Sequence, residues 1–311
     1  MQAAPAGTNR TGPGRTADGG IFMYTLFTDS DTDVTPKIAA EYGYKMISMP
    51  FTSDGVTVYP YEDGKEFDFH AFYDTLRAGA LPTTSAISEA RYEQYFEPEF
   101  AAGNDILYVH FSRAMTATFD AMDRAVEKLK AKYPERKFYA IDTMGITIAS
   151  FIVCLEVGDM YKAGKSAEEI VEWAKQEVPH FGTYFVADDL KFFRRSGRVS
   201  GLAATMGTLL GVRPIIYMSD EGKMVSLGTA RGRRKALEQL VGYIDDRGQD
   251  VEKYRVVIGN TDSPELVAEI REMLRQKYGD KLNIVEVVTN PTAGSHCGPN
   301  AVGLAFHVSH R

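Results

Sequence analysis

The chain has 311 residues, is 44% hydrophobic and carries a formal net charge of −7. This length suffices for two domains that each bury a hydrophobic core. The acidic balance argues against a nucleic-acid-binding surface and against electrostatic docking on anionic lipid. The two cysteines, Cys154 and Cys297, are too few for a disulfide-rich secreted scaffold, so we expect a reducing, cytoplasmic location.

Residues 1–22 are rich in Gly, Pro, Thr and Ala and show no hydrophobic periodicity. They lack the apolar centre of a signal peptide, so we expect a disordered extension or an added remnant, with Met23 as the natural start. No apolar run reaches the length of a membrane span. The six histidines show no short ligand spacing apart from His307 and His310 near the end of the chain, so no metal site is predicted.

From residue 23 to residue 178, short apolar segments alternate with amphipathic ones. Thr35, Pro36 and Gly43 are typical of an N-cap, a first helical residue and a terminator, and Ser166 with Glu169 forms a capping box. The predicted strands are 23–28, 45–52, 105–112 and 137–143, and the predicted helices are 36–42, 68–79, 118–134, 146–164 and 166–178. This alternation predicts an N-terminal α/β domain over 23–178 with a wound parallel sheet and flanking helices.

The pattern changes near residue 179, and we assign 179–311 to a second domain. Strands are predicted in 183–187, on both sides of a turn at 220–222, and in 254–260, 282–290 and 301–309. Helices are predicted in 190–197, in 231–248 and from Pro264 onward. This order predicts a C-terminal α/β domain with a mixed sheet.

Asp29, Asp31 and Asp33 alternate like the start of a calcium-binding loop. Such a loop requires Gly at its sixth position and Glu at its twelfth, where this chain has Val34 and Ala40. The calcium interpretation is therefore disfavoured.

Asp31 also begins a D-x-D-x-T pattern, the signature of magnesium-dependent phosphatases of the haloacid-dehalogenase type. In this chain Asp31 would be the first Asp of the pattern and Asp33 its partner. In those enzymes the first Asp directly follows a strand. The predicted strand stops before Asp29, so the favoured interpretation is an acidic loop that caps the next helix. The phosphatase remains as the alternative function.

Two segments place several hydroxyl groups close together. "LPTTSAIS" offers Thr83, Thr84 and Ser85, and "HFSRAMTATF" carries Ser112, Thr116 and Thr118 after a strand. Hydroxyls at a helix N-terminus or after a strand of a wound sheet suit an anionic oxygen. Ordinary helix capping explains the same residues, so both interpretations stay open.

Arg194, Arg195 and Arg198 form a basic cluster in an acidic protein. The glycines that follow lack P-loop spacing, so they indicate tight turns rather than a phosphate cradle. The arginines form either a solvated face or a contact surface for an acidic partner.

The segment "GSHCG" places His296 beside Cys297 near the end of the chain. We interpret it as an extended segment, in which neighbouring side chains point to opposite faces. Cys297 is then poorly placed to share a proton with His296, so neither thiol catalysis nor a metal site is predicted. From these residues alone, His296 is interpreted as a structural group in a loop.

Taken in order over 23–311, these segments resemble the DegV family, the fatty-acid-binding proteins that serve bacterial fatty acid kinase. "FTDSDTDVTP" resembles the family's D-S-x-x-D loop, and "LPTTSAIS" its P-x-T-S-Q-P-S stretch. "FSRAMTATF" stands where the family has S-S-x-L-S-G-T-Y, so Thr116 replaces a Ser. The most specific matches are "LKFFRRSGRVSGLAATMGTLLGVRPII", close to L-x-x-L-x-x-G-G-R-I…G-x-L-L-x-I-K-P-I, and "HCGPNAVGLAF", close to H-x-G-P-G-A-L-G-L.

The resemblance implies a two-domain α/β fold that buries an acyl chain between its domains. Thr84, Ser85, Thr116 and His296 would hold the carboxylate of a long-chain fatty acid such as palmitate, stearate or oleate. The chain would need no cofactor or metal and would not be an enzyme itself.

The resemblance also implies a protein partner. A fatty acid kinase would convert the bound acid with ATP to an acyl phosphate for phospholipid synthesis, and Arg198 and Arg231 would contact that kinase. We expect the binding protein itself to be a monomer.

Overall fold

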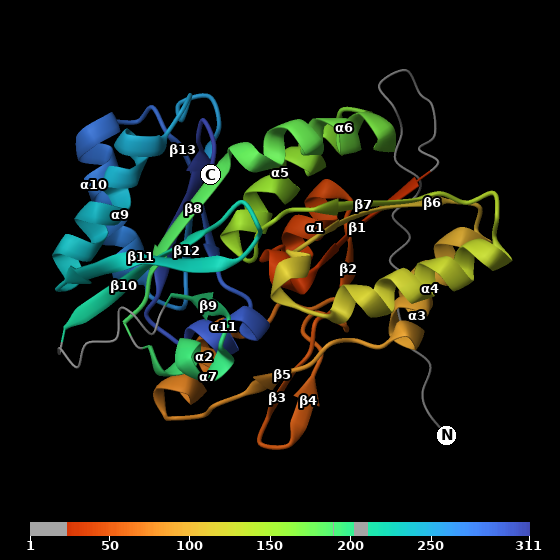
Figure 1. Ribbon diagram of the computed structural model, residues 1–311, viewed down its shortest axis with the longest axis horizontal. Helices are drawn as coiled ribbons and strands as arrows, with labels where there is room; N and C mark the ends of the chain where they lie inside the picture. The colour runs from red at the N-terminus through yellow and green to blue at the C-terminus, as the bar shows by residue number, and fades with distance from the viewer. Residues whose placement is uncertain (1–23, 189, 202–210) are drawn as a thin grey trace.

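The computed structural model describes residues 24–188, 190–201 and 211–311. The extension expected over residues 1–22 lies outside this part of the chain. Two sheets of different type lie side by side, a parallel sheet built from the first half of the chain and a mixed sheet built from the second (Figure 1). The predicted α/β class with one parallel and one mixed sheet is confirmed.

The parallel sheet has four strands in the order β2-β1-β6-β7. Its strands are β1 (Tyr24–Asp29), β2 (Lys45–Ile47), β6 (Asp105–His110) and β7 (Phe138–Asp142). Leu26 of β1 packs in a cluster with α1 (Pro36–Tyr42), α5 (Ile148–Lys162) and α6 (Ala167–Glu177). Phe27, the next residue, faces the opposite side and packs with α3 (Glu89–Ala101) and α4 (Thr118–Lys132). Both faces are therefore covered by helices, as buried parallel sheets require.

The mixed sheet has seven strands in the order β13-β12-β14-β8-β10-β11-β9. They are β8 (Phe181–Val186), β9 (Val199–Ser200), β10 (Val212–Met218), β11 (Met224–Arg231), β12 (Arg255–Asn260), β13 (Asn283–Val288) and β14 (Val302–His307). Helices α9 (Arg233–Arg247) and α10 (Pro264–Tyr278) pack on one face of this sheet.

Helix α5 belongs to both halves of the molecule. Ten of its fifteen residues are buried, because it packs on β1 and β6 of the parallel sheet and also against β8, β12 and β14. A helix that is apolar on all sides is explained by such complete enclosure. The N-terminus of α5 therefore lies where the two sheets meet.

A smaller layer crosses one side of both sheets. It holds a three-stranded sheet, β4-β3-β5, and three short helices. Its elements are β3 (Phe51–Ser53), β4 (Val56–Val58), β5 (Thr83–Thr84), α2 (Phe69–Arg77), α7 (Lys191–Ser196) and α11 (Pro291–Cys297). Phe51, Phe72 and Phe192 share one buried cluster, which joins segments from the first and second halves of the chain. The described residues also form the 3₁₀ turns η1 (Ser30–Thr32), η2 (Arg113–Met115) and η3 (Val178–His180).

Several sequence predictions were wrong, among them the end of the first strand, which runs through Asp29. The strand expected over 45–52 is two strands, β2 and β3, in different sheets. Helix α3 was missed, since Pro98 inside it interrupts the helical pattern. The segment around His296 is not extended, because Asn290 caps a helix there, Pro291 occupies its first position and Gly298 ends it.

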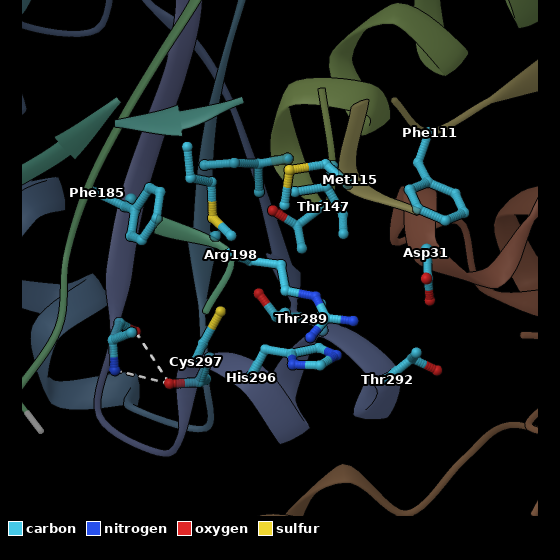
Figure 2. A pocket seen from close by; sticks show the side chains of 18 of the residues that line it. Asp31, Phe111, Met115, Thr147, Phe185, Arg198, Thr289, Thr292, His296 and Cys297 are labelled. Carbon is cyan, nitrogen blue, oxygen red and sulfur yellow. Dashed lines mark hydrogen bonds between the residues drawn. The ribbon is translucent and has the colours of Figure 1, made fainter. Parts of the chain in front are cut away.

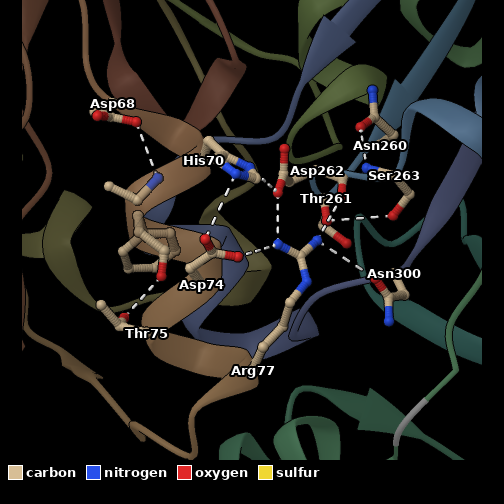
Figure 3. A network of polar contacts seen from close by, with 12 residues as sticks. Asp68, His70, Asp74, Thr75, Arg77, Asn260, Thr261, Asp262, Ser263 and Asn300 are labelled. Carbon is tan, nitrogen blue, oxygen red and sulfur yellow. Dashed lines mark hydrogen bonds and ion pairs between the residues drawn. The ribbon is translucent and has the colours of Figure 1, made fainter.

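A polar network on the surface ties α2 to the loop between β12 and α10 (Figure 3). Arg77 donates to the Asp262 carboxylate and to its carbonyl, each at 2.6 Å, and His70 lies 2.9 Å from the same carboxylate. His70, Asp74 and Asp262 also have the spacing of a metal-binding group. The Arg77 guanidinium engages both carboxylates, so we describe the cluster as an ion-pair network.

Candidate ligand-binding site

A cavity lies between the two sheets, and Figure 2 shows the side chains that line it. It encloses about 1070 Å³ of unfilled space, part of it continuous with solvent. Asp31, Phe111 and Ile146 line it just after the carboxyl ends of β1, β6 and β7. Ligands of wound α/β sheets bind at this edge. The position suits a small-molecule site.

Much of the cavity wall is hydrocarbon or thioether. Its apolar side chains come from both halves of the chain, and they are Met49, Phe111, Met115, Ile146, Ile148, Phe185, Met218, Met224, Ala301 and Val302. Unbranched Met side chains adapt to an irregular apolar ligand. The wall therefore favours a flexible apolar chain.

Thr84 and His296 meet at one end of this cavity. The Thr84 hydroxyl oxygen lies 2.8 Å from Nε2 of His296, and both residues line the wall. Thr84 is held in β5 by its pairing with Phe51 of β3, and His296 stands in the last turn of α11. Thr83 and Thr84 are strand residues, so they do not cap a helix, and Ser88 provides the cap of α3 instead.

The imidazole of His296 is neutral at physiological pH. Burial, with the nearby charges of Arg198 and Arg195, lowers the pKa of His296 to about 4. A neutral imidazole carries one proton. When Thr84 donates to Nε2, that proton is on Nδ1, which is buried and has no protein partner. His296 then presents an unused N–H donor.

Arg195 connects the two segments that carry Thr84 and His296. Its guanidinium donates to the Leu81 carbonyl at 2.6 Å, to the Pro82 carbonyl, and to the Ser295 carbonyl at 3.1 Å. Only a planar group with several N–H donors can reach three carbonyls in this way. The sequence analysis placed Arg195 in a solvated face or a partner contact. Arg195 instead links the segment that leads into β5 to α11.

The other predicted site residues are spread along the same wall or beyond it. Ser85 and Thr116 line the cavity, and the Thr116 hydroxyl also accepts from the Thr118 backbone N–H at 3.1 Å. Thr116 therefore supports the backbone at the start of α4 and also lines the cavity. Arg198 lines the cavity and donates to the Ser196 carbonyl, whereas Arg231 is exposed at the end of β11. The structure brings Thr84, Ser85, Thr116, Arg198 and His296 to one cavity.

The acidic loop does not form a phosphatase site. Strand β1 runs through Asp29, so Asp31 does not directly follow the strand but lies within η1. Asp29 accepts from Tyr108 at 2.9 Å and from the Asp31 backbone N–H, and burial raises its pKa to about 7. Asp33 Oδ1 accepts two N–H groups of Asn290 at 2.8 Å, so Asp33 holds the start of α11 in place. The phosphatase alternative is not supported.

Cys297 is a member of the cavity wall. The sequence analysis separated the side chains of His296 and Cys297 because it expected an extended segment. They are neighbours in helix α11 instead, where adjacent side chains also do not face each other. Burial raises the pKa of the Cys297 thiol to about 12, far from the range of a reactive thiolate.

Two cavity features were missed from the sequence. The bridging role of Arg195 depends on carbonyls 114 residues away and has no local signal. Helix α11 did have one, since Asn290, Pro291 and Gly298 are typical cap, first-turn and stop residues.

Comparison with known families identifies the chain. The model of the DegV family, described as uncharacterised, matches residues 23–308. The chain belongs to the DegV family. A DegV domain-containing protein of Clostridium perfringens is 29% identical over 283 residues, which cover 91% of this chain and 97% of the relative.

Solved DegV structures have the same fold. A Ruminococcus gnavus family member with vaccenic acid has a TM-score of 0.80 at 18% identity, covering 91% of this chain and 99% of its own. The fatty-acid-binding DegV of Bacillus subtilis has a TM-score of 0.78 at 23% identity, covering 93% and 100%. A Eubacterium eligens protein loaded with heptadecanoic acid has a TM-score of 0.78 at 20% identity, covering 92% and 100%. Within the described part of this DegV chain, no helix is long and apolar enough to cross a bilayer.

Proposed function

We propose that this DegV protein binds a long-chain fatty acid in the cavity between its sheets, with the carboxylate at the Thr84–His296 end. The observation that carries this proposal is the buried, unpartnered Nδ1 of His296 in a wall that combines an apolar lining with hydroxyl groups and Arg198. A buried polar atom without a partner is rare and points to a ligand group that completes it. The fatty acids bound to the R. gnavus and E. eligens relatives support the same cargo.

The chemistry of the wall fits both ends of such a ligand. Burial of an acyl chain contributes about 0.8 kcal/mol per CH₂, so fourteen of them contribute roughly 11 kcal/mol before ordering costs. A buried carboxylate is unfavourable unless it is hydrogen-bonded or paired. Hydroxyls of Ser85 and Thr116, the imidazole N–H and the Arg198 guanidinium supply donors and one positive charge, while the Thr84 hydroxyl donates to Nε2 and orients the imidazole.

We further propose that the protein presents this carboxylate to a fatty acid kinase and performs no catalysis itself. The kinase would transfer phosphate from ATP to the carboxylate oxygen, giving an acyl phosphate for phospholipid synthesis in the cytoplasm. Most of the proposed donors are neutral and Arg198 is the one charged group among them, so the carboxylate oxygen remains able to attack phosphorus. Arg198, at the cavity, and Arg231, on the surface, are the proposed kinase contacts, and the binding protein acts as a monomer.

Calorimetric titration of the delipidated full chain with palmitate and oleate tests the binding step. We expect dissociation constants of about 1 µM or tighter and binding at least about tenfold weaker for methyl palmitate, which keeps the chain but has no carboxylate charge. Equal binding of acid and ester would contradict the assigned carboxylate end. An absence of binding for every ligand would contradict the proposed function.

A further inference from the structure

The cavity contains a buried carboxyl group that the proposed carboxylate contacts do not use. Asp31 is only 4% exposed, lines the cavity, and has an Oδ1 atom that is buried without a partner. Its backbone is fixed, since its N–H donates to Asp29 at 3.0 Å and its carbonyl accepts from the Thr147 N–H at 2.8 Å. An unsatisfied buried oxygen held in place on a cavity wall indicates a ligand atom that pairs with it.

Asp31 lies close to the proposed carboxylate end. Its carboxyl points toward Thr292 in Figure 2 and interacts with the Thr292 hydroxyl. Thr292 and His296 are four residues apart in α11, so they occupy the same face one turn apart, roughly 5 Å along the axis. Asp31 is therefore near the first carbons of a chain whose carboxylate contacts His296, rather than near its distal end.

The hydrogen-bonding capacity of Asp31 is that of a neutral acid. Burial and the neighbouring carboxyls of Asp29 and Asp33 raise the pKa of Asp31 well above its usual range. The Thr292 hydroxyl donates its proton to the Met49 carbonyl at 3.0 Å. In its contact with Asp31, the same hydroxyl oxygen can therefore only accept a hydrogen bond. A neutral Asp31 can donate to Thr292, which leaves a carbonyl-like oxygen as an unpaired acceptor in the cavity wall. It also avoids charge repulsion with a ligand carboxylate.

We propose that the cavity is selective for a fatty acid with a hydroxyl group on its second or third carbon, and that Asp31 accepts the hydrogen bond of this hydroxyl. This inference rests on the proposed function, because it places the ligand carboxylate at His296. A plain fatty acid would leave the Asp31 oxygen without a partner. A 2- or 3-hydroxy acid satisfies it, and discrimination of this kind is strong where a buried group would otherwise be unpaired.

The test compares hexadecanoic acid with its 2-hydroxy and 3-hydroxy derivatives on the delipidated full chain. Wild type should bind one of the hydroxy acids about tenfold more tightly than hexadecanoic acid. Asp31→Leu should lose this preference, while Asp31→Asn, which keeps a carbonyl oxygen, should retain part of it. Thr183→Val is the matched control, because it removes another buried, unpartnered hydroxyl that lines the cavity from β8. It should keep the full preference.

The outcomes separate this inference from the proposed function. If wild type binds hexadecanoic acid and the hydroxy acids equally, or if Asp31→Leu and Asp31→Asn keep the full preference, the role of Asp31 is wrong and fatty-acid binding stands. If Thr183→Val loses the preference as well, the selectivity does not belong to Asp31. If no acid binds to wild type, both the proposed function and this inference fail. Should Asp31→Leu not fold, Asp31→Ala, which removes the carboxyl without adding bulk, replaces it in the comparison and should lose the preference.

Discussion

The hydroxyl of Thr84 lies 2.8 Å from Nε2 of His296, although 212 residues separate the two in the chain. Thr84 is fixed by a short strand pairing and His296 by a seven-residue helix. Arg195 binds carbonyls on both sides, and Asn290 and Thr292 also tie α11 to the N-terminal half through Asp33 and the Met49 carbonyl. These contacts bring the N-terminal and C-terminal parts of the chain together at the cavity.

Replacement of His296 by Ala should weaken fatty-acid binding while the fold is retained. The substitution removes the Nδ1–H donor, so the ligand carboxylate loses one hydrogen bond. The loss of this bond should lower the affinity about tenfold. Titration of delipidated protein with palmitate measures this change. His310→Ala, at an exposed histidine near the end of the chain, is the matched control and should bind as wild type does. Unchanged affinity of His296→Ala would place the carboxylate elsewhere in the cavity.

Acidification should destabilise the protein through His296. The pKa of His296 is about 4 in the folded protein and about 6.5 in an unfolded chain. Between these values the unfolded state binds the proton preferentially, so the stability associated with neutral His296 is complete above pH 6.5 and is lost as the pH falls toward 4. On going from pH 7 to 4.5, wild type should lose about 2 kcal/mol more of its free energy of unfolding than His296→Gln. Urea unfolding at both pH values measures the difference, and equal losses would show that His296 titrates normally.

Replacement of Arg195 by Lys should impair ligand binding even though the charge is kept. A single ammonium group cannot span the carbonyls of Leu81, Pro82 and Ser295 with the geometry of a guanidinium. We expect about tenfold weaker palmitate binding and an altered NMR signal of the His296 ring. Arg234→Lys, on exposed α9, is the control and should change neither. A wild-type affinity and ring signal in Arg195→Lys would mean that the bridge does not position the site.

The two proposed kinase contacts should behave differently. Arg231 is exposed, so Arg231→Ala should leave palmitate binding unchanged and reduce phosphorylation of the bound acid by the kinase. Arg198 lines the cavity beside His296, so Arg198→Ala should reduce both phosphorylation and affinity, the latter about two- to tenfold. Binding and single-turnover phosphorylation assays on the same samples separate these effects. Normal phosphorylation of both variants would remove them from the kinase interface.

Much of the fold could be predicted because local signals were strong. Thr35 and Gly43 do begin and end α1, and Ser166 with Glu169 forms the capping box of α6. The apolar segment of α5 was identified as a helix, but its role between two sheets depends on tertiary packing that no local pattern carries.

The site was less predictable because its contacts are long-range. The resemblance to DegV proteins selected Thr84 and His296, but their hydrogen bond and the Arg195 bridge join segments that are distant in the chain. The sequence placed Asp31 only in a calcium-loop spacing, a phosphatase motif or a capping loop. Its place on the cavity wall follows from the packing of η1 against α5 and α11, which the acidic spacing does not encode.

The central claim is that the cavity holds one fatty acid by its carboxylate at His296. Native mass spectrometry of the full chain, purified without detergent, tests this claim most directly because it measures cargo mass and stoichiometry together. The account predicts one bound long-chain acid per monomer in wild type and a largely empty His296→Ala variant. Wild-type protein without acyl cargo that also fails to take up added palmitate, or equal cargo in both proteins, would contradict it.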